Sequence, residues 1–157
     1  MVVKAVFDCM LYLQAVTNQR GVAFKCFQLA EEGLVELQVS PLVLAEVDDV
    51  LHRPELTAKF AQLTPDRVAR FLRRVLAVAT THAAPAHAFD LLRDHDDEPY
   101  LDLAIVAGCQ YLVTWNERHL TYLMRQDTPE GRDFCRRFPS TRIVTPPVFV
   151  RDVESGM

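Results

Sequence analysis

Short apolar runs alternate along the chain with longer segments in which apolar residues recur at helical spacing. The short runs are rich in β-branched residues, as expected of strands that are covered on both faces. Strands are predicted at residues 2–8, 35–40, 111–116 and at the start of 141–150. Helices are predicted at residues 21–33, 41–52, 64–81 and 98–108. This alternation is typical of a parallel α/β sheet with helices on both sides.

Residues with known capping preferences mark several of these boundaries. Ser40 and Pro41 form a helix-start signal, with serine as the N-cap and proline at the first helical position. Thr64 precedes the next helix in the same way. No internal repeat, low-complexity tract or long Gly/Ser linker divides the chain, and we expect residues 1–157 to form one domain.

Two acidic residues stand at positions that the surrounding pattern marks as buried. Asp8 ends the first apolar run, and Glu46 falls inside the apolar arc of the helix over 41–52. The arc consists of Leu42, Val43, Leu44, Val47, Val50 and Leu51. A carboxylate there is costly unless it is paired or binds a metal. Ordinary roles are also open, because Asp8 could cap a helix that begins near Met10 and Glu46 could extend to the helix edge.

Two further polar residues are expected at the same edge of the sheet. Asp97 lies at the start of the helix predicted over 98–108, at the centre of its buried face, whereas Glu98 and Asp102 lie off that face. Asn116 follows the strand over 111–116. The alternatives are stabilisation by the helix dipole for Asp97 and a turn position for Asn116. Because ligands bind beyond the carboxyl ends of parallel strands, we expect these side chains to converge there.

This combination of side chains indicates a site for a hard divalent cation. No lysine or arginine lies within three residues of Asp8, Glu46 or Asp97, so no local salt bridge is expected to neutralise them. Clustered carboxylates are the ligands that Mg²⁺ and Mn²⁺ prefer, and Asn116 can add a neutral oxygen. Such a metal polarises a phosphodiester and lowers the pKa of the attacking water.

Composition and charge exclude several classes of protein. Half of the residues are hydrophobic and 24% are charged, as in ordinary globular proteins. No apolar segment approaches the ~20 residues that span a bilayer, and the N-terminus lacks the features of a signal peptide. We therefore expect a cytoplasmic protein that does not bind membranes. The spacing of the four cysteines predicts neither a disulfide nor a zinc site.

The net charge of −4 argues against nucleic-acid binding through overall charge alone, but a local basic patch remains open. Arg67, Arg70 and Arg74 recur at i, i+3 and i+7 and could hold RNA, although a solvated helix face has the same spacing. A second group of arginines lies in residues 124–138. The five histidines show no pairing that suggests general-base catalysis.

The order of these motifs resembles the PIN-domain family. A strand ending in Asp8 is followed by Ser-Pro-x-x-x-x-Glu at 40–46, by Asp-Asp-x-x-x-Leu at 96–101, and by Tyr-Leu-Val-Thr-x-Asn at 111–116. The similarity is in particular to the toxins of type II toxin–antitoxin systems (VapC-like). It covers roughly residues 2–150, and the order and spacing of the motifs are more specific than any one of them.

This resemblance implies a three-layer α/β/α sandwich around a parallel sheet of four to five strands. It also implies a Mg²⁺- or Mn²⁺-dependent endoribonuclease that acts on RNA, is usually a homodimer, and is often held inactive by a small antitoxin protein. Matched by position, the metal-binding and catalytic residues are Asp8, Glu46, Asp97 and Asn116, with Thr114 and Ser40 as supporting residues.

Two positions depart from the family pattern. Family members commonly have asparagine two residues after the first aspartate, whereas Met10 stands here and is expected to fill apolar space. Asn116 is neutral where the family often has aspartate. An alternative function is therefore a catalytically weak PIN domain that binds RNA or a protein. A nucleotide-binding domain is disfavoured, because neither Gly-x-Gly-x-x-Gly nor a phosphate-binding Gly-Lys-Ser/Thr occurs.

Overall fold

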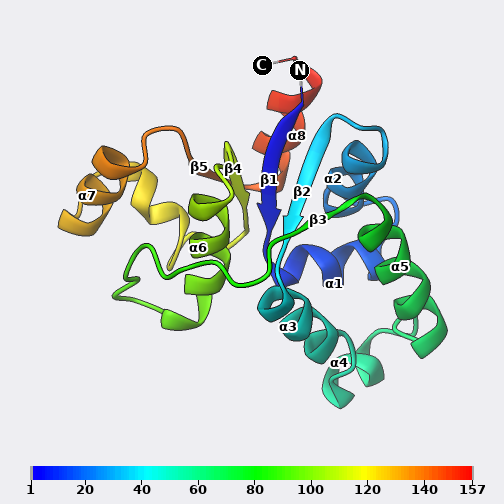
Figure 1. Ribbon diagram of the computed structural model, residues 1–157. Coiled ribbons are helices and arrows are strands. Elements are labelled where there is room, and N and C mark those ends of the chain that lie inside the picture. The colour runs from blue at the N-terminus through cyan, green and yellow to red at the C-terminus, as the bar shows by residue number, and fades with distance from the viewer. Residues whose placement is uncertain (1, 157) are drawn as a thin grey trace.

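Five parallel strands in the order β3-β2-β1-β4-β5 form the central sheet of the computed structural model, which describes residues 2–156 (Figure 1). The strands are β1 (Val3–Phe7), β2 (Val35–Val39), β3 (Thr80–Thr81), β4 (Tyr111–Val113) and β5 (Arg142–Val144). In the central pairs, Val3 of β1 lies opposite Val35 and Ala5 lies opposite Tyr111. The described strands pair only in parallel, which confirms the predicted α/β class.

Helices cover both faces of the sheet. They are α1 (Cys9–Thr17), α2 (Val22–Glu31), α3 (Pro41–Leu51), α4 (Pro54–Lys59), α5 (Pro65–Val78), α6 (Glu98–Val106), α7 (Pro129–Arg137) and α8 (Pro146–Glu154). Two 3₁₀ turns, η1 (His95–Asp97) and η2 (Thr121–Arg125), precede α6 and α7. In Figure 1, α6 packs on the front of β1 and β4, whereas α2 and α8 pack together behind the sheet. The predicted three-layer α/β/α sandwich is confirmed.

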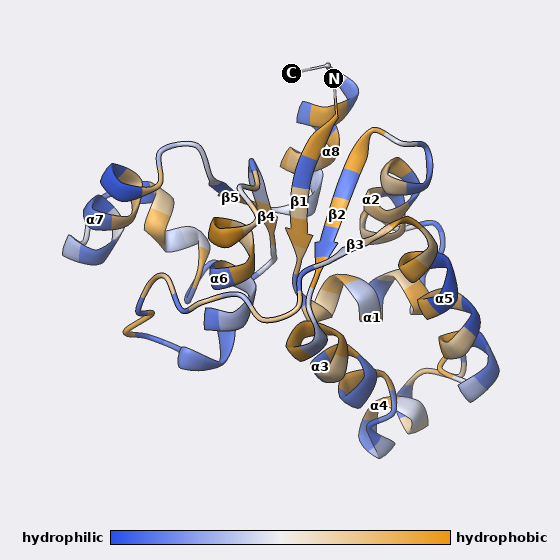
Figure 2. Ribbon diagram, viewed as in Figure 1, coloured by the Kyte–Doolittle hydropathy of each residue, from blue (hydrophilic) through white to orange (hydrophobic). Residues whose placement is uncertain are grey.

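Apolar side chains fill the space between the sheet and the helices. Phe7 of β1 packs edge-to-face against Phe27 of α2 and Phe149 of α8, with ring centroids 5.0 and 5.6 Å apart. Figure 2 shows largely apolar strands and polar residues on the outer sides of α5 and α7. No helix within residues 2–156 is long and apolar enough to cross a membrane.

The helix predicted over residues 64–81 is shorter in the structure. It begins as expected, because the Thr64 hydroxyl accepts a hydrogen bond from the amide of Arg67 at 3.2 Å. It ends at Val78, and Thr80–Thr81 form the edge strand β3 beside β2. β-branched threonines favour extended backbone, and tertiary pairing with β2 completes this change.

The apolar pattern alone did not predict α1, α4, α7 or α8. The cause is clearest for α1, because this helix contacts α2, α3 and α5 and has no continuous polar face. Its buried residues are Leu11, Tyr12, Leu13, Ala15 and Val16. A helix that is apolar on most sides shows no 3.6-residue alternation of polar and apolar positions. The strand predicted at the start of 141–150 is confirmed as β5, and α8 begins at Pro146.

The strand order produces a crevice at one end of the sheet. From β1 the chain proceeds to β2 and β3 on one side, and it later returns to β4 and β5 on the other side. The connections after β1 and β4 therefore diverge beyond neighbouring strand ends, which is where α/β sheets bind ligands. Asp8 follows β1 and Thr114 follows β4, so both residues lie at this crevice.

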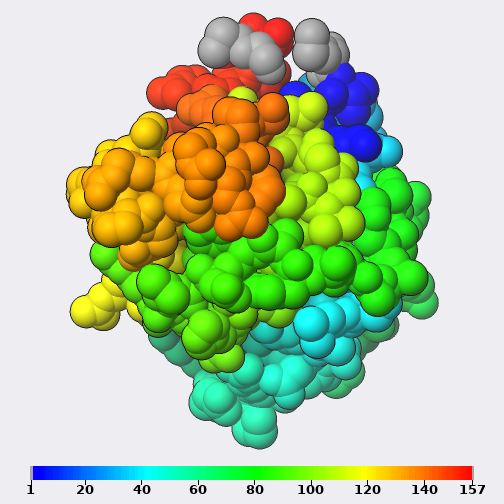
Figure 3. Space-filling view, turned by 60° about the vertical axis from the view of Figure 1, so that its left-hand side comes forward, coloured from blue at the N-terminus to red at the C-terminus, as the bar shows by residue number. Residues whose placement is uncertain are grey.

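A segment without regular structure, residues 82–94, connects β3 to η1 and α6. Figure 3 shows this segment, in green, crossing the surface between α3–α4 and α7. Asp102 of α6 holds it, because its Oδ1 accepts hydrogen bonds from the amides of Ala88 (2.9 Å) and Phe89 (3.4 Å). Glu98 accepts a further bond from the amide of Leu91 at 2.7 Å.

The position expected for Asp102 was therefore wrong. The helical wheel placed this residue off the buried face, but Asp102 is only 8% exposed. The segment over 82–94 packs against the side of α6 that the wheel left to solvent. A helical wheel considers the residues of one helix alone. It therefore cannot show that a loop packs on that helix and that the loop's backbone amides need acceptors.

Candidate metal centre

Asp8 is a buried carboxylate at the end of β1. It is 6% exposed and caps α1, because its Oδ1 accepts hydrogen bonds from the amides of Met10 (3.1 Å) and Leu11 (3.3 Å). Its other oxygen, Oδ2, accepts a hydrogen bond from the Thr114 hydroxyl. The two roles considered for Asp8 thus coexist: one oxygen serves the helix, and the other lies in the crevice between β1 and β4.

Ionising the Asp8 carboxylate is energetically unfavourable in this position. Burial raises its pKa to about 6, and the nearby negative charge of Glu46 acts in the same direction. The hydrogen bonds from Thr114, Leu11 and Met10 oppose this shift but do not cancel it. A neighbouring cation would favour the charged form.

Glu46 projects from α3 toward α6. Its Oε1 accepts a hydrogen bond from the Tyr100 hydroxyl at 2.9 Å. Burial raises the pKa of Tyr100, so that the hydroxyl stays a neutral donor. The buried face of α3 is narrower than the apolar arc predicted for it, because Leu42 is 64% exposed. Glu46, which was expected inside that arc, is half-buried. Ser40 starts the helix as predicted, with its Oγ accepting from the amide of Val43 at 3.2 Å.

Asp97 and Asn116 form the other side of the site. Asp97 immediately precedes α6, and its Oδ2 accepts a hydrogen bond from the Asn116 Nδ2 at 2.9 Å. The backbone amide of Asn116 donates a hydrogen bond to the Thr114 hydroxyl oxygen at 3.0 Å. Because this hydroxyl also donates to Asp8, Thr114 bridges Asp8 and Asn116. Because strand β4 ends at Val113, Thr114 and Asn116 lie in the following turn and not in the strand itself.

The charge environment connects the three acids. The pKa of Asp97 is raised to about 6, mainly by burial and also by the negative charges of Asp94, Asp8 and Glu46, while His119 acts in the opposite direction. The structure therefore brings Asp8, Glu46 and Asp97 within mutual electrostatic influence. Among the ion pairs of residues 2–156, none joins a lysine or arginine to any of the three.

Two residues at this site were missed from the sequence. Asp94 Oδ2 lies 3.0 Å from the Nδ1 of His119, and the ligand atoms of Asp94, Asp97 and His119 all lie within 4.8 Å of one another. The Asn116 Oδ1 accepts the amide of His119 at 3.0 Å, which closes the turn and brings the imidazole back toward Asp97. The spacing Asn-x-x-His at 116–119 was the sequence feature that could have indicated this turn and the position of His119.

The donor set is chemically suited to a hard divalent cation. It offers carboxylate oxygens from three separate elements, an amide and one imidazole, and no thiolate. The hydrogen-bond partners of the three acids are amides, hydroxyls and the Cys9 thiol at Glu46. All are neutral, because burial raises the pKa of Cys9 to about 12. Burial, together with the negative charge of neighbouring carboxylates, raises the pKa of Asp8 and Asp97, and a bound cation would favour their charged forms.

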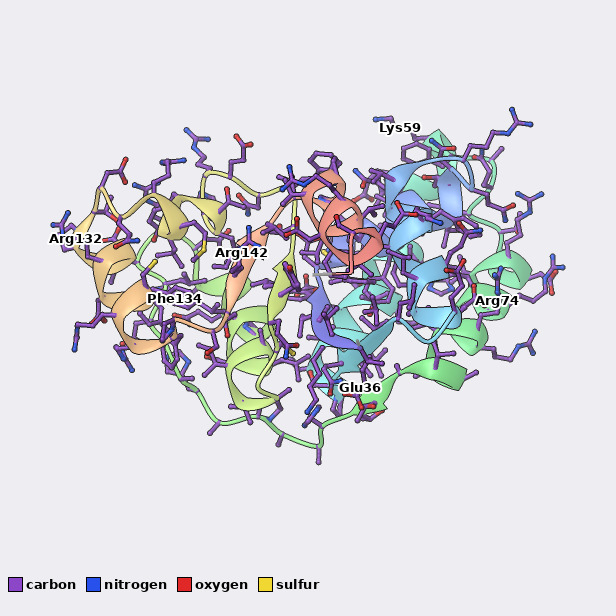
Figure 4. All side chains as sticks on the ribbon, turned by 90° about the horizontal axis from the view of Figure 1, so that it is seen from above. Glu36, Lys59, Arg74, Arg132, Phe134 and Arg142 are labelled. Carbon is purple, nitrogen blue, oxygen red and sulfur yellow. The ribbon has the colours of Figure 1, made fainter. Side chains whose placement is uncertain are left out.

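The arginines proposed for RNA binding occupy other surfaces. Arg70 pairs with Asp66 at 2.8 Å and Arg74 pairs with Glu31 at 2.7 Å. Together with Arg67 they line a cavity of about 330 Å³ between α1, α2 and α5. Figure 4 shows Arg74 and Arg132 at opposite ends of the molecule, so the two arginine groups do not form one patch.

Comparison with known proteins agrees with this architecture. The model of the PIN domain family matches residues 4–118, a range that contains Asp8, Glu46, Asp97 and Asn116. No curated protein sequence gives a significant match. PIN domains are generally nucleases that use divalent metals. The matched range is well over half of the chain, and the chain therefore belongs to the PIN-domain family.

Proposed function

We propose that this protein is a Mg²⁺- or Mn²⁺-dependent endoribonuclease that cleaves RNA phosphodiesters. The observation that carries the proposal is the convergence of Asp8, Glu46 and Asp97 at the crevice without a lysine or arginine partner among the described residues. Buried carboxylates are retained in this way where they bind metals or take part in chemistry.

The three acids would hold the ion through their carboxylate oxygens, with Asn116 as the neutral member of the set. Asp94 and His119 lie beside them and complete the rim of the site. When bound, the ion polarises the phosphodiester and lowers the pKa of the attacking water.

The protein itself keeps these ligands in fixed orientations. The amides of α1 and the Thr114 hydroxyl orient Asp8, and the Tyr100 hydroxyl orients Glu46. The Asn116 amide orients Asp97. Partners of this kind fix the ligand geometry before the substrate arrives, and their loss typically costs about 10–100-fold in metal affinity or activity.

We further propose a biological role as the toxin of a toxin–antitoxin pair, in which a single PIN domain forms a homodimer and a small antitoxin holds it inactive. The similarity of the motifs at 40–46 and 96–116 to VapC-like toxins supports this role. Arg67, Arg70 and Arg74 are the candidate RNA contacts outside the crevice. A neighbouring gene for a small antitoxin, and capture of its product by this protein, would test the role.

A catalytically weak PIN domain that binds RNA or a protein remains the second candidate. Asn116 favours it, because this side chain adds no negative charge and its oxygen already accepts the amide of His119. A site with fewer charged ligands binds a divalent cation less tightly. This candidate predicts RNA binding without metal-dependent cleavage.

The deciding experiment is cleavage of single-stranded RNA by the purified protein with Mn²⁺ and then with EDTA. The proposal predicts cleavage that requires the metal and is abolished in Glu46→Gln. Asp48→Asn is the matched control, because Asp48 lies on the same helix with its side chain 65% exposed. Cleavage that persists in EDTA or in a folded Glu46→Gln protein would contradict the assignment.

A further inference from the structure

A cavity of about 260 Å³ lies next to the candidate metal centre. Trp115 forms one wall, and the end of α1 and the beginning of α2 form the rest. Trp115 stands in the chain between Thr114, which bonds Asp8, and Asn116, which bonds Asp97. The cavity is therefore attached to the turn that orients two of the three acids.

The indole of Trp115 is exposed but fixed in orientation. Trp115 is 41% exposed, so part of its apolar ring surface faces water. Its Nε1 donates a hydrogen bond to the Gln14 Oε1 at 2.8 Å. A large aromatic side chain held in one orientation, with part of its surface open to solvent, is suited to stacking.

Amide donors at the cavity complement this aromatic wall. Gln14 and Asn18 both line it, and within residues 2–156 neither side-chain NH₂ group donates to a protein acceptor. Gly21 leaves room beside Asn18, because a Cβ at position 21 would lie 3.0 Å from the Asn18 Nδ2. The cavity thus presents an aromatic surface together with hydrogen-bond donors.

The distance to the metal centre is short. Gln14 lies six residues after Asp8 along α1, which corresponds to about 9 Å along a helix axis. A group bound on Trp115 would therefore be near the crevice and not at a remote surface. The arginine-lined cavity also borders α1, at Ala15 and Val16, but it does not include Trp115 or another residue of the turn between Thr114 and Asn116.

We propose that this cavity binds an unpaired nucleobase of the RNA substrate, stacked on Trp115 and hydrogen-bonded through its acceptor atoms by Gln14 and Asn18. The inference rests on the proposed function and specifies how its substrate is recognised. Single-stranded RNA is commonly held by bases stacked on aromatic side chains and hydrogen-bonded at their edges. Nucleobases carry carbonyl and ring-nitrogen acceptors, which match the free amide donors.

The chain carries its own probe for this site, because Trp115 is its single tryptophan. We would titrate the metal-free protein in EDTA with single-stranded oligoribonucleotides and follow tryptophan fluorescence. Saturable quenching is expected with RNA that carries bases, and none is expected with an abasic ribose-phosphate strand. Equal quenching by the abasic strand, or no quenching by RNA, would overturn the nucleobase assignment.

Variants test the stacking contact independently of the fluorescence. Binding of dye-labelled RNA should weaken about 5- to 150-fold in Trp115→Ala and much less in Trp115→Phe, which keeps an aromatic ring. Val106→Ala is the matched control, because Val106 is also exposed (48%) but lies at the far end of α6. Circular dichroism melting would confirm that the variants are folded, and unchanged RNA affinity in folded Trp115→Ala would overturn the proposal.

The results separate this inference from the proposed nuclease function. Metal-dependent cleavage with no quenching and a wild-type affinity in Trp115→Ala would overturn the nucleobase site and leave the nuclease standing. Base-dependent quenching without any cleavage in Mn²⁺ would support the nucleobase site and contradict the nuclease.

Discussion

Asp8 performs two tasks with its two carboxylate oxygens. One oxygen caps α1, and the other faces Thr114 in the crevice where Glu46 and Asp97 also contribute negative charge. The first task needs only an oxygen acceptor, whereas the second depends on the charge. Asparagine is about as good an N-cap as aspartate, so a substitution can separate the two.

The first prediction concerns Asp8→Asn. This change should abolish metal-dependent RNA cleavage, while the free energy of unfolding of the metal-free protein stays equal or rises, because the repulsion among the acids decreases. Denaturant unfolding in EDTA and an RNA cleavage assay would measure both effects. Asp8→Ala is the control for the cap and should lose about 1 kcal/mol. A clearly destabilised Asp8→Asn with intact cleavage would contradict the charge-based role.

The second prediction concerns Met10. Its backbone amide donates to the Asp8 cap, but Met10 is 43% exposed and does not fill the apolar space expected for it. An asparagine at this position can donate a hydrogen bond to a neighbouring carboxylate, which methionine cannot do. Met10→Asn should therefore tighten Mn²⁺ binding by about tenfold, measured by calorimetric titration. Because the position is exposed, little change in unfolding free energy is expected; unchanged or weaker Mn²⁺ binding would reject this role.

Among the elements, α3 and α5 could be predicted because local residues determine where they begin. Ser40 and Thr64 cap them in the manner that their sequence indicates. The end of α5 could not be predicted, because pairing with β2 converts Thr80–Thr81 to a strand. The wheel of α6 likewise could not include the loop that buries Asp102.

The convergence of the acids could be predicted in part from the parallel sheet. Parallel strands bring their carboxyl ends to one edge, so Asp8 and the residues after β4 had to lie near each other once the fold class was right. Asp94 and His119 were missed because their approach depends on two turns, one before α6 and one after Asn116. Turn geometry of this kind has little signature in the pattern of apolar residues.

The third prediction concerns the attachment of residues 82–94 to α6. Asp102 accepts two backbone amides and also contacts His87 Nδ1 at 3.0 Å. Asp102→Ala should leave these buried amides without acceptors, lower the unfolding free energy by about 1–3 kcal/mol and make residues 82–94 easier to cleave by protease. Asp90→Asn is the control, because exposed Asp90 contacts the same histidine but accepts no amide. Equal effects of both changes would show that the histidine contact, and not the amides, secures the segment.

For the molecule as a whole, the fourth prediction links stability to pH and metal. The folded protein holds Asp8 and Asp97 with pKa values of about 6, above the ~3.9 of an unfolded chain, so it binds these protons more tightly. Their contribution to stability is complete below about pH 4 and is lost as the pH rises through about 6. In EDTA, the melting temperature of the wild type should therefore fall relative to that of Asp8→Asn over this interval.

Adding Mn²⁺ should reverse this loss, because an ion that binds only the folded state stabilises it. The metal-induced rise in melting temperature should be large above pH 6 and should fade below it, where protons compete for the carboxylates. Asp97→Asn and Glu46→Gln should show little metal-induced rise at any pH. Equal rises in the wild type and in both variants would place the bound metal elsewhere.

The hydrogen bond between Asp8 and Thr114 also bears on how the protein is made. The two residues are 106 positions apart, and β4 must pair with β1 before they can meet. During synthesis, Asp8 emerges first, and the ribosome needs roughly 5 to 20 seconds to add the residues in between. The nascent chain therefore lacks the contact between Asp8 and Thr114 until residue 114 has been made. The side chain of Asp8 is therefore fixed in the crevice only after β4 has been made and has paired with β1.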